Sequence, residues 1–423
     1  MKKFIIVGLF ACLGCFKEEK IDPSTASTFV KYFNGGFNDF AEDIKQTSDG
    51  GYIMLATSEV RPNEVTPARF KIKLTKVDEF GALQWQKLYP EFDNVNNTDS
   101  VSYKGRAISL VVDGAGIETG YVVVGDSIQK GLTNKSHLRI MLTDTEGNMT
   151  RAKSIDPSGG VRVLVSNQLV GIPVEGKAVA ISSTGSFIVL SQANPLISDR
   201  MYLSEFSANL DSMWSRSYEA GATSLSNRLF IDAAASLFWS GTVTKSSNRS
   251  DIRLTKAPPN SQNTEFDLDI GTPGNKETGM DMCEYGFGFA VIGTTDETAA
   301  KDEDLLFKRI GQDGAVLASQ QFGFPGQAEN GLAISQARDG GLVLLGSVDS
   351  NTEVGRGGKD YYLIKINAFG DTEWTRIFGS KSDDIGKKVI SLSDGSYTIF
   401  GTTIWGGLRT MTLIKTDSQG QIE

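Results

Sequence analysis

The chain has 423 residues, and its 51 Asp and Glu outweigh its 42 Lys and Arg, so the formal charge is −9 at pH 7. We therefore expect no nucleic-acid partner, because binding a phosphate backbone requires a basic surface. One histidine is too few for a multi-histidine metal site, and three cysteines are too few for a disulfide framework.

The first residues, MKKFIIVGLFACLG, place two lysines before an apolar run that is too short to span a bilayer. This layout is typical of a secretory signal, so we expect residues 1–14 to be removed. Their loss takes away Lys2 and Lys3 and changes the formal charge from −9 to −11. The following cysteine stands in a small-residue setting, Leu-Gly-Cys, which resembles the lipobox of bacterial lipoproteins. The resemblance implies lipidation of Cys15, with Cys12 as a competing position.

The stretch after this cysteine, CFKEE, resembles the export signal of surface lipoproteins in the Bacteroidota. In that signal a lysine and two acids follow the lipidated residue, which implies the same role for Lys17, Glu18 and Glu19. The other interpretation is a charged, solvated tether over residues 15–26. Both interpretations anchor the protein to the outer membrane by acyl chains, with the cell surface as the expected side.

A unit of about 50 residues recurs along the chain and is clearest at 329–379. It reads ENGLAISQARDGG, LVLLGSV, DYYLIKI and TEWTRIFG, a pattern that predicts four strands joined by turns. The first and third strands recur seven times, and so does the second: YIMLATS at 52, YVVVGDS at 121, FIVLSQA at 187, LFWSGTV at 237, FAVIGTT at 289, LVLLGSV at 342 and YTIFGTT at 397. Such self-similarity is typical of solenoids, propellers and arrays.

The fourth strand follows only six of these units, since the last unit ends at GQIE. The stretch STFVKYFNG at 27–35 resembles the missing copy, with Phe29 in the place of Trp374. Pairing it with the C-terminal strands would close a ring, which leaves only short, protected edges. We therefore predict an all-β fold over residues 27–423. It is a seven-bladed β-propeller of four-stranded blades, closed by the N-terminal strand on the C-terminal blade.

The turn between the third and fourth strands reads KVDEFGALQW at 76–85 and KINAFGDTEW at 365–374. It is similar to the tryptophan-docking repeat of quinoprotein-like propellers and, more loosely, to the Asp-box of sialidases. With the DGG-type turns and the signal region, the chain resembles a Bacteroidota outer-membrane or surface lipoprotein with DGGY-type repeats. We interpret the turn as structural, because Asp or Asn accepts backbone hydrogen bonds, Gly tolerates positive φ and the aromatic ring caps the neighbouring blade.

Cofactor and metal chemistry have little support in the sequence. The chain lacks the adjacent cysteine pair that many quinoprotein dehydrogenases place over their cofactor, and Cys283 stands in an apolar strand as a packed thiol. The acid-rich stretch DETAAKDEDL at 296–305 lacks the spaced acids and the glycine of a calcium loop. We therefore expect no cofactor, no metal site and no catalytic residue.

Long loops are expected on one face of the ring, at 58–69, 90–104, 156–175 and 350–359, opposite short turns such as SDGG. The segment 156–175 is unusually apolar. It is predicted to pack against a partner or over the central channel, or else to form an extra strand on its own blade. The candidate binding residues of this face are Arg61, Tyr103, Leu164, Leu169, Arg356 and Trp405.

The leading functional hypothesis is a non-enzymatic, lipid-anchored propeller that serves as a protein-binding or scaffold subunit of an outer-membrane complex. Its partner would be an integral outer-membrane protein or another envelope protein. The alternative is a carbohydrate-binding or sialidase-like, glycan-active propeller, for which Trp405 and Tyr103 are the hints in the sequence. A quinone-dependent enzyme is a third hypothesis.

Overall fold

The computed structural model describes residues 28–61, 68–89, 101–129, 135–157, 162–165, 168–171, 173–193, 200–219, 224–246, 249–258, 261, 263–296, 303–349 and 356–422. Over these residues the chain forms thirty β-strands and no helix, which confirms the predicted all-β class. The described part of the chain accordingly contains no helix long and apolar enough to cross a membrane.

Four-stranded antiparallel groups account for all but two strands, and four of the groups are separate sheets of consecutive strands. The first is β2 (Asn38–Gln46), β3 (Tyr52–Val60), β4 (Arg69–Val77) and β5 (Leu83–Tyr89). The second is β6 (Val101–Val112), β7 (Glu118–Gln129), β8 (Lys135–Thr143) and β9 (Met149–Ile155). The third is β12 (Val174–Ile181), β13 (Phe187–Ala193), β14 (Arg200–Phe206) and β15 (Ser212–Glu219). The sixth is β24 (Glu329–Gln336), β25 (Leu342–Asp349), β26 (Lys359–Ile366) and β27 (Thr372–Phe378).

The fourth and fifth groups form one continuous sheet, joined by a single parallel bridge between Ser250 and Lys276. The fourth group is β16 (Ser224–Ile231), β17 (Leu237–Ser246), β18 (Arg249–Ala257) and β19 (Phe266–Ile270). The fifth is β20 (Lys276–Glu284), β21 (Gly288–Asp296), β22 (Glu303–Gly311) and β23 (Val316–Phe322). Since the bridge is one residue pair, the two groups keep the four-strand pattern of the others.

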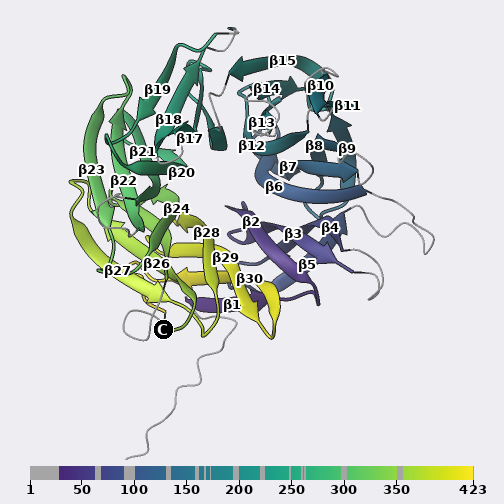
Figure 1. The fold of residues 1–423 in the computed structure, drawn as a ribbon. Coiled ribbons are helices and arrows are strands. Elements are labelled where there is room, and N and C mark those ends of the chain that lie inside the picture. Colours follow the sequence, from purple (N-terminus) through teal and green to yellow (C-terminus); the bar gives the residue numbers. More distant parts are fainter. Residues whose placement is uncertain are drawn as a thin grey trace, which may run out of the picture.

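The last group joins the two ends of the chain. Its order is β1-β30-β29-β28, where β1 is Phe29–Phe33, β28 is Asp384–Ser391, β29 is Tyr397–Trp405 and β30 is Leu408–Thr416. Phe29 lies opposite Lys415 and Phe33 opposite Met411 in an antiparallel ladder. The predicted pairing of the N-terminal strand with the C-terminal strands is therefore present, and Figure 1 shows these first and last strands side by side.

One edge strand of each group lies toward a common centre (Figure 1): the first strand in each of the first six groups and β28 in the last. These strands, β2, β6, β12, β16, β20, β24 and β28, are called the inner strands. Each inner strand contacts that of the next group, and β2 also contacts β28 and β30 of the last group. The groups therefore follow one another around the centre in the order of the sequence.

Each inner strand carries a β-bulge at the same place in its group. The register shifts lie at Ala41/Asp43, Gly105/Ala107, Gly176/Ala178, Ser226/Arg228, Gly279/Asp281, Gly331/Ala333 and Gly386/Lys388. The residue before each shift is small because the preceding group approaches it closely. A Cβ on Gly331 would lie 2.3 Å from the carbonyl oxygen of Gly293, and one on Gly105 would lie 2.6 Å from a methyl carbon of Leu55.

Hydrogen bonds between groups form at the same small residues. The backbone N–H groups of Gly105 and Gly279 donate to hydroxyls of the preceding group, Thr57 at 3.1 Å and Thr242 at 3.0 Å. Ala41 of the first group donates in the same way to a hydroxyl of the last group, Thr402, at 2.9 Å. Each of these bonds satisfies a backbone donor that stands next to a bulge, where the regular ladder is interrupted.

Aromatic side chains of the fourth strands pack on turn glycines of the next group. Rings of Trp85 and Trp374 lie against Gly147 and Gly420, where an added Cβ would be 2.6 Å from each ring. Phe29 of β1 occupies the equivalent place of the last group, since a Cβ on Gly81 of the first group would lie 2.9 Å from its ring. This is the role that the sequence comparison of Phe29 with Trp374 predicts.

The turns also have the structural role expected of them. Asp78 accepts the backbone N–H groups of Phe80 at 3.0 Å and Ala82 at 2.7 Å, and Gly81 has φ of 75°. In the SDGG turn, Asp49 accepts the N–H of Gly51 and pairs with Lys76 at 2.7 Å. Carboxylates that accept backbone donors stabilise such turns and orient the strands on either side.

The apolar segment at 156–175 forms a sheet of its own. Its strands β10 (Arg162–Val165) and β11 (Gln168–Gly171) pair as a hairpin in which Leu164 lies opposite Leu169. The segment therefore does not form an extra strand on its own blade. Whether the hairpin faces a partner or the channel stays a prediction.

The close approach at Gly331 leads to a stability prediction. The variant Gly331→Ala should lower the free energy of unfolding by about 1–3 kcal/mol, because its Cβ collides with backbone atoms that cannot move independently. The control Gly114→Ala should leave stability within about 0.5 kcal/mol, since no atom lies within 4 Å of an added Cβ there. Urea unfolding measures both, and equal midpoints for the two variants would contradict the packing argument.

Candidate functional site

The residues inserted by the bulges meet at the centre of the molecule. A cavity of about 270 Å³ is lined by six of them together with their neighbours on β12 and β28: Glu42, Arg106, Gly176, Lys177, Met280, Leu332, Ile385, Gly386, Lys387 and Lys388. A bulge turns one extra side chain out of the ladder, and the inner strands share a common centre, so the inserted side chains converge. We call this space the axial cavity.

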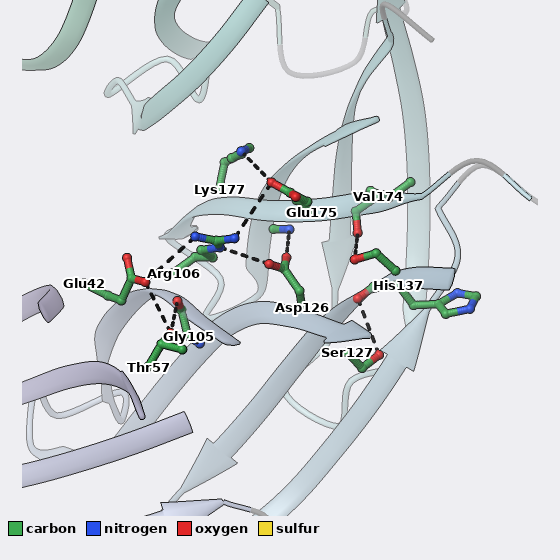
Figure 2. A network of polar contacts seen from close by, with 12 residues as sticks. Glu42, Thr57, Gly105, Arg106, Asp126, Ser127, His137, Val174, Glu175 and Lys177 are labelled. Carbon is green, nitrogen blue, oxygen red and sulfur yellow. Dashed lines mark hydrogen bonds and ion pairs between the residues drawn. The ribbon is translucent and has the colours of Figure 1, made fainter. Parts of the chain in front are cut away.

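An ion-pair network forms one wall of the axial cavity (Figure 2). Arg106 of β6 donates through Nε to Asp126 of β7 at 3.0 Å. Its two terminal nitrogens lie 3.8 Å from Glu42 of β2 and 3.9 Å from Glu175 of β12. Lys177 pairs with Glu175 at 3.0 Å. One guanidinium therefore links carboxylates of the first three groups.

A second set of charges crosses the centre. Lys387 of β28 pairs with Glu42 at 3.1 Å, and Lys388 reaches Asp281 of β20 at 3.2 Å. Arg228 of β16 lies 3.5 Å from the other oxygen of the same carboxylate. Asp281 thus holds cations from the fourth and seventh groups, which are not neighbours of each other.

Burial changes the protonation of these groups. Burial and the nearby Glu175 outweigh the attraction of Arg106 and raise the pKa of Asp126 to about 6. Burial disfavours the charged form of Arg106, but the carboxylates around it outweigh that effect and raise its pKa. For Lys388 the effect of burial is larger than the attraction of the adjacent Asp281, so its pKa is lowered.

The lining of the axial cavity is cationic. It contains Arg106, three lysines and one carboxylate, Glu42. The other carboxylates that hold these cations, Asp126, Glu175 and Asp281, are not among the lining residues. The side chain of Lys387 is 44% exposed, so its ammonium can leave the carboxylate of Glu42 and bind an anionic group of a ligand instead. Guanidinium and ammonium groups form short, charge-assisted hydrogen bonds with carboxylate, sulfate and phosphate oxygens. The arrangement is suited to binding an anion.

The structure distributes the sequence-predicted binding residues over several groups. Arg61 is exposed at the end of β3 and pairs with Glu59 at 3.0 Å. Tyr103 lies at the start of β6, half-buried, with the guanidinium of Arg139 5.1 Å from its ring centre. Neither lines the axial cavity.

The other two described candidates lie close to the N-terminal strand. Trp405 ends β29, is 54% exposed and stacks on Tyr32 of β1 with ring centres 5.0 Å apart. Arg356 and the same Tyr32 line a separate cavity of about 360 Å³. Side-chain positions of Leu164 and Leu169 lie outside the described part of the structure, as do Cys15, Lys17, Glu18 and Glu19. Their roles stay predictions.

Sequence reasoning missed the axial residues. They occupy one position of the repeat, directly after the small residue of the first strand, as in GRAISL, GKAVAIS and GKKVISL. Because the residue type at this position changes from unit to unit, no local motif marks it. Aligning the seven units on that small residue would have revealed a column rich in charge.

Metal coordination has no candidate site among the residues that the structure describes, since no group of three or more His, Cys, Asp or Glu side chains is arranged to hold an ion. His137 lies half-buried on β8 and not in a loop, and its carbonyl oxygen accepts from Ser127 at 3.5 Å. Cys283 is partly buried beside an apolar cluster, and burial raises its pKa to about 12. A thiol with so high a pKa is a poor nucleophile.

No family model and no curated protein matches this sequence. Solved structures match its fold. A protein of unknown function from Dyadobacter fermentans DSM 18053 matches with a TM-score of 0.50 at 10% identity, covering 92% of this chain and 97% of that one. The polysaccharide lyase Uly1 matches with a TM-score of 0.51 at 11% identity, covering 91% and 90%. The NanB sialidase of Streptococcus pneumoniae (K499G mutant) matches with a TM-score of 0.45 at 11% identity, covering 94% and 69%.

These comparisons correct one prediction. The expectation that the protein is not an enzyme is wrong as an inference from its fold, because solved structures of similar fold include a polysaccharide lyase. At 11% identity the likeness shows a propeller-like fold alone and assigns no reaction to this chain. None of the comparisons addresses the resemblance to Bacteroidota lipoproteins.

Proposed function

We propose that this protein is a propeller that binds an acidic saccharide at its axial cavity. The observation that carries the proposal is the convergence of Arg106, Lys177, Lys387 and Lys388 on one small cavity. A carboxylate on a sugar would accept hydrogen bonds from these cations and compete with the protein carboxylates that now hold them. An acidic glycan is therefore preferred over a neutral one.

The remaining lining fits a sugar ring. Met280, Leu332 and Ile385 form an apolar side of the cavity, and one face of a pyranose exposes mainly C–H groups. The volume, about 270 Å³, lies just below the range of about 300–1,000 Å³ that is typical for drug-sized ligands. It therefore suits one saccharide unit. The carbohydrate hypothesis accounts for both the charged and the apolar wall.

A calorimetric titration tests this proposal with aldotriouronic acid, a glucuronate linked to two xyloses, and with xylotriose as its neutral counterpart. The full chain in detergent should bind the acidic probe and not the neutral one. Lys177→Ala and Lys387→Ala should each weaken binding by about tenfold or more, since a hydrogen bond to a charged group contributes about 1.5–3 kcal/mol. Lys153→Ala, on the outer strand β9, is the matched control.

The same titration has a pH dependence and a second readout. Binding should strengthen as the pH falls from 7 to 5, because Asp126 has a pKa of about 6 and its protonation frees Arg106 for the ligand. Asp126→Asn should flatten this dependence. Equal affinity for the two probes, or wild-type affinity in both lysine variants, would exclude the proposal. Product analysis of the acidic probe determines whether binding leads to cleavage.

We infer that the seven four-stranded groups are the blades of one closed ring. Support comes from β1, which completes the last group, from the Ala41 to Thr402 hydrogen bond and from the contact of Phe29 with Gly81. Deleting residues 24–36 should cost roughly 5 kcal/mol or more, because removing each buried Phe ring costs about 3–5 kcal/mol. Deleting residues 17–22 is the control, and unchanged cooperativity and melting temperature in the first deletion would contradict closure.

The site of action is also a proposal. We propose that residues 1–14 are cleaved and that Cys15 carries acyl chains that hold the propeller at the outer membrane, as the lipobox-like stretch indicates. Metabolic labelling with a palmitate analogue should be lost in Cys15→Ala and kept in Cys12→Ala, and the opposite pattern would assign the lipid to Cys12. Co-purification from outer membranes tests the predicted envelope-protein partner.

A further inference from the structure

A second cavity adjoins the axial cavity. Its volume is about 350 Å³, and it lies between the fifth and sixth groups, with walls from β20, β21, β22, β24, β25, β26 and β28. Met280, Leu332 and Ile385 line both cavities. The two spaces therefore meet along one apolar ledge, of which Met280 is 37% exposed. We call the second space the radial groove.

Part of the wall of the radial groove is neutral and polar, formed by Thr278, Thr294, Asn330 and Ser347. Thr278 stands on β20, and Thr294 of β21 lies 3.4 Å from Asn330 of β24, across the boundary between the two groups. Hydroxyl and amide groups both donate and accept hydrogen bonds, as sugar hydroxyls require. Gly331 adds no side chain, so the groove stays open beside the ledge.

Charges of both signs line the groove where its strands begin or end. Lys276 and Lys359 stand there with Asp296 and Glu303, so the lining has no excess of either sign. Lys359 is held by Asp349 at 3.1 Å. A second carboxylate on the ligand would meet two lysines and two acids in the groove, whereas the lining of the axial cavity has four cations and one acid. The two spaces thus select different sugar units.

We propose that the ligand is an oligosaccharide with one acidic unit in the axial cavity and neutral units along the radial groove. The inference rests on the proposed function, since it assumes that the axial cavity holds the acidic unit. Met280, Leu332 and Ile385 contact the apolar face of the chain where it leaves the axis. Thr278 and Asn330 hydrogen-bond the hydroxyls of the neutral units.

Chain length is the variable that tests this inference. The full chain should bind aldotriouronic acid about tenfold more tightly than glucuronic acid alone, because only the longer probe makes the hydrogen bonds of the groove. Trigalacturonic acid should bind no more tightly than aldotriouronic acid, because the groove has no excess of positive charge to hold its further carboxylates. Equal affinity for mono- and trisaccharide overturns the inference, and so does tighter binding of trigalacturonic acid.

Variants in the groove separate this inference from the proposed function. Thr278→Trp should fill the groove and abolish the advantage of the trisaccharide while glucuronic acid binds as before; Thr150→Trp, on the exposed strand β9, is the matched control. Asn330→Ala, which adds no bulk, should reduce the advantage several-fold. Lys387→Ala should weaken both probes equally. If neither acid binds the wild-type chain, the proposed function fails as well; if the advantage survives Thr278→Trp and Asn330→Ala, only the radial groove is excluded.

Discussion

The structure depends on the close approach of neighbouring sheets at one small residue in each inner strand. At Gly105 and Gly331 the preceding group leaves no room for a Cβ. A bulge follows each of these residues and interrupts the ladder, and in several groups the N–H of the small residue donates to a hydroxyl of the neighbouring group. The same bulge turns the next side chain toward the centre. Packing between groups and the composition of the axial cavity therefore have a single geometric origin.

Burying the charged side chains around that cavity costs free energy of desolvation. Moving ions out of water carries a desolvation penalty that a buried pair recovers only through good geometry and further hydrogen bonds. Arg106 meets this condition by facing three carboxylates, and Asp126 does so by also accepting the N–H of Gly176 at 2.8 Å. The raised pKa of Asp126 shows that the compensation is incomplete. A ligand anion would therefore have to replace one of the protein carboxylates that hold Arg106 and Lys387.

The fold itself does not select a function. Solved structures of similar shape include a polysaccharide lyase, and at 11% identity the likeness extends to architecture alone. The chemical character of the centre in this chain follows from which residues stand at the bulges. Basic residues at the second, third and seventh bulges and apolar residues at the fifth and sixth, Met280 and Leu332, give the centre a charged side and an apolar side.

The sequence by itself determined the strand pattern, the all-β class and the role of Phe29, because these follow from local periodicity and from a repeat whose missing strand stands at the other end of the chain. It also determined the turn chemistry, since Asp78 and Gly81 act within a few residues of each other. Only the tertiary structure decided the axial cavity. Arg106, Lys177 and Lys387 are up to 281 positions apart (387 − 106), and their meeting depends on the curvature and spacing of the sheets, which no single repeat encodes.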